Sequence, residues 1–168
     1  GGLFSKIPFT GVMMWIGSLA IIGFPYFSGY YSKDSILENA YFSSSSMGSY
    51  AYFVGIVTAL LTAFYSWRLL LLTFHGSTKV LNKDFEKIHE SPLVMLIPLL
   101  LLSIGSVFSG IFLSEYFIGS KVNDFWNSSI IIFESHYYMP FSQIFLTKFA
   151  VAFGIFISVL FYFFRKQL

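Results

Sequence analysis

The sequence predicts an all-α integral membrane protein with four transmembrane helices, the first of them discontinuous. Of its 168 residues, 56% are hydrophobic and only 11% are charged, and the mean hydropathy is positive. A soluble domain of this size keeps much of its surface in water, so it would not bury so many apolar side chains. The second observation is a long uncharged stretch that breaks at glycine and proline and is followed by three more apolar stretches. We expect residues 1–168 to form a single membrane-embedded unit.

The first predicted span covers residues 7–42 and is interrupted near Phe24–Gly29. No residue in Ile7–Ser32 is charged, and this stretch is long enough to cross a bilayer. Pro8 stands where a proline in the first turn of a helix is tolerated. Because Pro25 lacks a backbone donor and glycines permit sharp turns, the break exposes main-chain groups that hydrocarbon does not satisfy. Such a break belongs beside protein or water.

The other predicted spans are residues 50–74, 92–113 and 140–164. Small polar residues in Ser43–Gly48 favour a short exposed loop before the second span. Arg68 is the only charge within the second span, and Lys148 interrupts the fourth. The third carries no charge between Glu90 and Glu115, and its length fits a bilayer of roughly 30 Å at about 1.5 Å per residue.

The distribution of basic residues orients this topology. Four crossings place both ends of the chain on one side of the membrane. That side holds Lys6, Lys79, Lys83, Lys87, Arg165 and Lys166. The opposite loops hold only Lys33 and Lys121. By the positive-inside rule the ends and the loop of residues 76–91 face the cytoplasm or the mitochondrial matrix.

Composition also excludes several functions. The formal net charge is only +2 and no basic cluster is interleaved with recognition residues, so no nucleic-acid partner is expected. The absence of cysteine excludes disulfides, thiolate metal sites and thiolate-held iron–sulfur clusters in this chain. Glu134 and His136 are too isolated to form a metal site. We therefore assign this chain neither a metal nor a cofactor.

Lys33 and Asp34 directly follow the break and are the candidate functional residues. Charges in a membrane segment are costly and usually serve ion or proton transfer. An ordinary interpretation competes with this one: the break is simply the end of a helix, and Ser32 or Asp34 caps a short interfacial helix that reaches Phe42. From the residues alone this ordinary interpretation is the favoured one.

The remaining ionisable residues in the spans have weaker assignments. We expect Arg68 to be structural, either extending to the basic face or pairing with an internal carboxylate. His75 belongs either to a proton path or, as we favour, to the interface at the end of a span. Lys148 is either buried against a partner or turned towards an interface, and no motif assigns it. His89 and Glu90 are expected in a loop.

Several motifs occur in one order along the first part of the chain: Gly1–Pro8, Gly23–Leu37, Thr62–Leu69 and Thr73–Gly76. In order and spacing they resemble chain 5 of NADH:ubiquinone oxidoreductase, the respiratory complex I. The resemblance is specific over residues 1–76, and it implies an antiporter-like helical bundle in which the broken first span is the discontinuous twelfth helix of the family. It also implies that Lys33 is a proton-relay residue with Asp34 as its acidic partner. The functional interpretation of this pair is then preferred.

The resemblance carries further expectations about the assembly. NADH, FMN, iron–sulfur clusters and ubiquinone would bind to other subunits, and this chain would hold no redox site. Its partners would be other complex I membrane-arm subunits, including a separate chain with the N-terminal helices of the same subunit, and the lipid bilayer. The mitochondrial inner membrane is the expected location, with a bacterial plasma membrane as the alternative. Two other functions stay open: a subunit of an Mrp-type sodium/proton antiporter, and a structural membrane subunit without transport.

Overall fold

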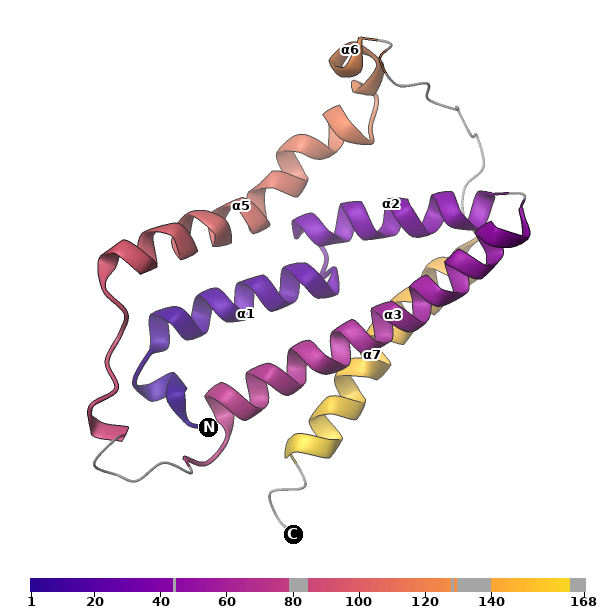
Figure 1. Cartoon of the computed structure of the whole chain (residues 1–168). Helices are drawn as coiled ribbons and strands as arrows, with labels where there is room; N and C mark the ends of the chain where they lie inside the picture. Colours follow the sequence, from indigo (N-terminus) through magenta and orange to yellow (C-terminus); the bar gives the residue numbers. More distant parts are fainter. Residues whose placement is uncertain (44, 79–84, 128, 130–139, 164–168) are drawn as a thin grey trace.

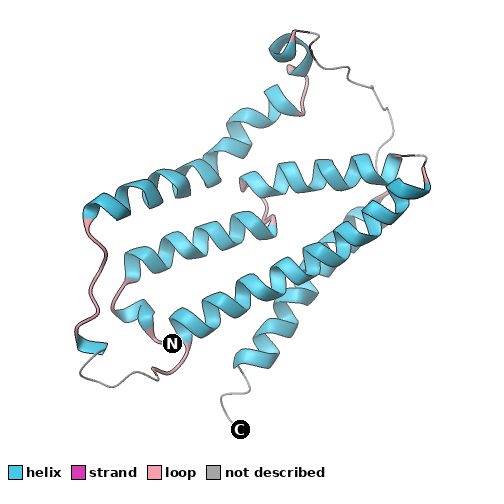
Figure 2. Ribbon diagram, viewed as in Figure 1, coloured by secondary structure: helices cyan, strands magenta, loops and turns pink. Residues whose placement is uncertain are grey.

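The computed structural model describes residues 1–43, 45–78, 85–127, 129 and 140–163 of the chain. The described part is a bundle of helices without strands, three of which are long and apolar enough to cross a membrane (Figures 1 and 2). These three are α3 (Ser46–Leu70) with its π-helical extension (Leu71–His75), α5 (Leu93–Phe117) and α7 (Phe141–Phe163). The predicted all-α membrane fold is confirmed.

The predicted broken span consists of α1 (Pro8–Ile22) and α2 (Ser28–Phe42). Each has 15 residues, or about 22 Å of helix, so neither alone crosses a hydrocarbon core of roughly 30 Å. In Figure 1 the two halves follow one another in the same general direction. Pro8 occupies the start of α1, as its missing N–H allows.

The break between these halves has a definite hydrogen-bond pattern. Gly23 has φ +83° and donates to Ala20 O at 3.2 Å, and Phe24 N donates to Leu19 O at 3.0 Å. This is the arrangement in which a left-handed glycine ends a helix. A turn follows in which Phe27 N donates to Phe24 O at 3.1 Å, with Tyr26 at φ +73°. The predicted interruption is therefore present, one residue earlier than expected.

Helix α2 begins earlier than the ordinary interpretation required. Its first residue is Ser28, the residue before it is Phe27, and no side chain caps it. Ser32 and Asp34 lie within the helix, where the Ser32 hydroxyl donates to Ser28 O at 3.4 Å. The expectation that either residue caps a short interfacial helix is wrong, because the turn after Pro25 already supplies the geometry that starts the helix.

The bounds of the later helices differ from expectation mainly where caps act. The loop predicted over Ser43–Gly48 is shorter, because the Ser45 hydroxyl accepts from Gly48 N at 3.1 Å and α3 starts at Ser46. Helix α5 continues four residues beyond the expected end at Leu113. Two short helical pieces were not predicted, Leu3–Ser5 and α6 (Val122–Trp126). Lys79, Lys83, Glu134, His136, Arg165 and Lys166 lie outside the described residues.

The closest helix pair is α3 with α7, which cross in Figure 1 and pack through small residues. Ala59, Ala63 and Ser158 have no exposed surface, and a side chain at Gly154 would strike the Leu60 carbonyl. Small residues let membrane helices approach closely where no hydrophobic effect drives them together. Most side chains of α5 and the stacked Phe141, Phe145, Phe149 and Phe153 of α7 are instead exposed on the outside of the bundle.

Glu90, which was expected only as a loop residue, caps the N-terminal end of α1. Its carboxylate accepts from Phe9 N at 2.6 Å, Thr10 N at 3.2 Å and the Thr10 hydroxyl at 2.9 Å. It thereby satisfies free N–H groups at the positive end of α1. Partial desolvation raises the pKa of Glu90, but these hydrogen bonds, with one from Ser91, outweigh it and lower the pKa below its ordinary value.

The close approach of the two half-helices predicts a strong effect of adding one methyl group at the break. A Cβ at Gly29 would collide with the Ala20 carbonyl, whereas a Cβ at Gly17 would meet nothing within 4 Å. We expect Gly29→Ala to lower the free energy of unfolding by about 1–3 kcal/mol. Gly17→Ala is the matched control and should not lower it. Unfolding in lipid bicelles measures both, and equal stability of the two variants would contradict this account of the break.

Glu90→Gln should destabilise the protein by about 0.5–2 kcal/mol at neutral pH, because the amide replaces a carboxylate at a helix N-terminus. Since the folded-state pKa is depressed, the contribution of Glu90 is fully present above its unfolded-state pKa and is lost as the pH falls through the lower folded-state value. The difference between the two proteins should therefore shrink below about pH 4. Glu86→Gln, on the same loop but exposed, is the control. A pH-independent difference would refute the role of the charge.

Candidate functional site

The break in the first span positions Lys33 at the C-terminal end of α1. Lys33 is half-buried, and its ammonium donates to the Ile22 carbonyl at 3.4 Å. Ile22 is the last residue of α1, where carbonyls lack helical partners and carry the negative end of the helix dipole. The lysine thus partners a main-chain group that the break leaves free.

Asp34 pairs with a residue far along the chain, Lys148 of α7. The Lys148 ammonium donates to Asp34 Oδ2, and the two side chains are 36% and 34% exposed. The same ammonium lies 4.1 Å from the centre of the Tyr30 ring, within the range of a cation–π contact. No motif in the sequence assigned Lys148, although a lone cation in an apolar span indicates a partner elsewhere in the fold.

These three charged residues line one cavity of about 390 Å³. Its wall comes from the end of α1, the break residues Gly23 to Pro25, α2, Trp67 of α3 and one face of α7. Apart from Lys33, Asp34, Lys148, Thr147 and Tyr30, the lining side chains are apolar or aromatic. The three charged side chains, together the charged centre, therefore lie in a cavity between helices and are only partly exposed.

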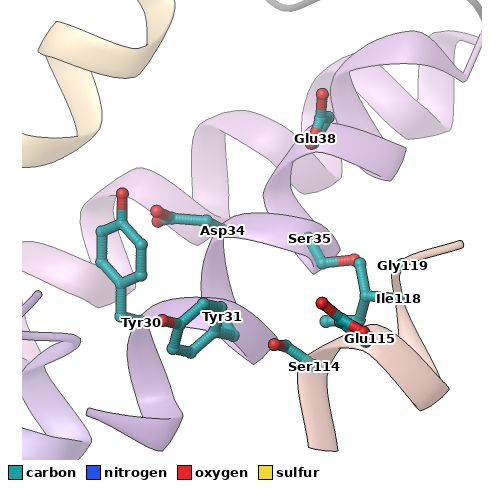
Figure 3. A pocket seen from close by; sticks show the side chains of 9 residues that line it. All are labelled: Tyr30, Tyr31, Asp34, Ser35, Glu38, Ser114, Glu115, Ile118 and Gly119. Carbon is teal, nitrogen blue, oxygen red and sulfur yellow. The ribbon is translucent and has the colours of Figure 1, made fainter. Parts of the chain in front are cut away.

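A second hollow, of about 310 Å³, lies between α2 and the last turn of α5, and Asp34 is among the residues that line it (Figure 3). Asp34 and Glu38 share one face of α2, being four residues apart, and Glu115 lies near the end of α5. Tyr30, Tyr31, Ser35 and Ser114 are also in its lining. The hollow thus has three carboxylate residues, Asp34, Glu38 and Glu115, in its lining.

Two other ionisable residues lie apart from this centre. The Arg68 guanidinium is 5.4 Å from the centre of the Tyr162 ring, a contact between α3 and α7. The His75 ring is exposed and lies 5.6 Å from the Trp15 ring and 5.7 Å from the Phe4 ring. Neither residue lines the cavity of Lys33. The sequence did not predict the ring contact of Arg68, and the structural and interfacial roles favoured for these two residues stay predictions.

The fold and the site define a helical integral membrane protein with a charged centre beside a broken helix. Residues 1–62 match the family model described as "NADH:quinone oxidoreductase/Mrp antiporter, TM". The chain is thus homologous to part of NADH-ubiquinone oxidoreductase chain 5, and the resemblance stated from the motifs is confirmed.

The similarity to individual relatives extends past the motifs. Chain 5 of Marchantia polymorpha is 46% identical over 132 residues, which cover 79% of this chain and 20% of the relative. Chain 5 of Dictyostelium citrinum is 39% identical over 173 residues, covering 99% and 26%. NADH-quinone oxidoreductase subunit L of Rhodobacter capsulatus is 45% identical over 138 residues, covering 76% and 19%. The chain spans about a quarter or less of the length of these relatives.

Proposed function

We propose that this chain is a portion of the membrane arm of NADH:ubiquinone oxidoreductase and that Lys33 carries protons in an antiporter-like path. The observation that carries the proposal is the Lys33 ammonium at the broken helix, in one cavity with Asp34. The names of the relatives support the assembly, and the family description supports the antiporter-like class. The chain itself supplies one segment of the path.

Lys33 is suited to loading and releasing a proton because opposing influences act on its ammonium. Desolvation favours the neutral amine, whereas a nearby carboxylate and a carbonyl acceptor favour the charged form. In this site the Ile22 carbonyl and the neighbouring Asp34 act in the second direction. A small rearrangement of either partner changes the proton affinity of the amine. Asp34 modulates Lys33 in this scheme and is the next group on the way out.

The exit would follow the hollow from Asp34 past Glu38 to Glu115. Glu115 lies in the last turn of α5, at the end of the span that the positive-inside rule assigns to the outer side of the membrane. A proton that leaves Lys33 would therefore reach the intermembrane space in a mitochondrion, or the periplasmic side in a bacterium. We favour the mitochondrial inner membrane as the location.

In this scheme the redox chemistry takes place in other subunits. NADH, FMN, the iron–sulfur clusters and ubiquinone would bind there, and this chain would contribute no redox cofactor. The earlier part of the proton path would come from helices on a separate polypeptide. Membrane-arm subunits and lipid would cover the exposed apolar faces of α5 and α7.

Replacing Lys33 tests the proton relay directly. In sealed vesicles that contain the assembled complex, Lys33→Ala should slow proton transfer through this path by about 100-fold, because a positioned transfer group contributes roughly 10²–10⁴-fold. Lys33→Arg should fail as well, since a guanidinium does not release its proton in proteins. The readout is protons moved per NADH oxidised, with Lys6→Ala as the control. Unchanged coupling in both Lys33 variants, with normal assembly, would favour the purely structural subunit.

The antiporter alternative makes a different prediction for purification. The family description covers Mrp antiporters as well as the oxidoreductase. If the chain belongs to the oxidoreductase, an affinity tag on it should recover flavin and iron–sulfur absorbance together with NADH oxidation activity. Recovery of a membrane complex that lacks both chromophores and exchanges sodium for protons would establish the Mrp-type function instead.

A further inference from the structure

Asp34 lies beside two lysines, yet the structure gives its carboxylate to the more distant one in sequence. Its ion pair is with Lys148 on α7, whereas the adjacent Lys33 turns its ammonium to the Ile22 carbonyl at 3.4 Å. All three charged groups line the same cavity of about 390 Å³. The Asp34 carboxylate therefore has two ammonium groups around the same cavity and forms an ion pair with only one of them, that of Lys148.

The position of Lys148 is set by packing that does not depend on Lys33. The neighbouring Thr147 is buried, and its hydroxyl donates to Gln143 O at 3.2 Å. The Tyr52 hydroxyl on α3 donates to Gln143 Oε1 at 3.0 Å, which links the two helices one turn away. Further along α7, the closely packed Gly154 holds the helix against α3. Tyr30 then provides the aromatic face on which the ammonium rests.

We propose that Lys148 is a positioning residue for Lys33: by pairing with Asp34, it keeps that carboxylate from neutralising the Lys33 ammonium. This inference rests on the proposed function and adds a partner on α7 that the sequence did not assign. The Lys33 ammonium then has the Ile22 carbonyl as its hydrogen-bond partner, which is a weaker partner than a carboxylate, and the Asp34 charge acts on it without a direct ion pair.

Removing the charge of Lys148 has two effects on Lys33, and both increase the proton affinity of its amine. The repulsion between the two ammonium groups disappears, and Asp34 becomes free to pair with Lys33. Both effects make Lys33 hold its proton more firmly, so proton release requires a higher pH. Removing the charge of Asp34 acts in the opposite direction, because the attraction is lost while the repulsion by Lys148 stays.

Other titratable groups around the Asp34–Lys148 pair limit the choice of variants. On α2 they are Tyr30, Lys33 and Glu38, which line the cavities shared with the pair. Tyr52 of α3 reaches the turn of α7 before Lys148. Glu115 of α5 lines the hollow on the other side of Asp34. The substitutions at positions 34 and 148 leave all of these groups unchanged.

The experiment measures NADH-driven proton pumping against pH in sealed vesicles that hold the assembled complex. Lys148→Met should shift the pH profile of pumping upward by about one unit or more, the size of effect that a nearby opposite charge produces. Lys148→Arg keeps the charge and should keep the profile. Asp34→Asn should shift the profile downward, and the double variant Asp34→Asn/Lys148→Met should lie between the two. Lys6→Met, which removes another aromatic-bound lysine at the end of the bundle, is the matched control.

The opposite signs separate positioning from mere packing, because a structural defect would lower assembly without moving the profile. An unchanged profile in Lys148→Met, or equal shifts in Lys148→Met and Lys148→Arg, would overturn the proposal. If Lys148→Met does not assemble, Lys148→Gln gives the same test with Asp34 still present, and an unchanged pH profile of pumping in that variant would overturn the proposal. An effect of Lys33→Ala on pumping together with such a result would sink this inference alone and leave the proposed function standing.

Discussion

The structure depends on how main-chain groups find partners where a membrane helix is interrupted. Hydrocarbon offers no hydrogen bonds, so a break survives only where protein supplies them. Here α1 ends at Gly23, where the N–H groups of Gly23 and Phe24 donate to carbonyls of the last turn. The Lys33 ammonium donates to the carbonyl of Ile22. The lysine is consequently a structural partner of the broken helix.

A second constraint is the close packing of α3 against α7. Alanine, glycine and serine residues let these helices approach closely. This contact positions Lys148 of α7 at the same level along the bundle as Asp34 of α2. The ion pair is then only partly exposed, in a cavity whose remaining wall is mostly apolar. Charges in such surroundings influence one another more strongly than they would in water. The bundle therefore couples the packing of α7 to the electrostatics of the broken span.

The two ends of the bundle differ in their polar contacts. Asp34, Glu38 and Glu115 line the hollow between α2 and the last turn of α5, while the apolar surfaces of α5 and α7 face outward. At the start of α1 the Glu90 carboxylate caps the helix. Carboxylates therefore serve two purposes in this chain: one satisfies a helix end, and three line a hollow between helices.

The sequence by itself determined the membrane class, the helical spans to within a few residues and the location of the break, because hydropathy and glycine or proline act locally along the chain. It also placed Lys33 and Asp34 beside that break. It did not determine that α2 starts at Ser28, that Glu90 caps α1, or that Asp34 pairs with Lys148. Those features join residues far apart in sequence, as Asp34 and Lys148 are, and only the packing of the helices brings their charges within reach. Only the tertiary structure decided which of the two lysines forms an ion pair with Asp34, because that pairing depends on distances between helices that no local pattern encodes.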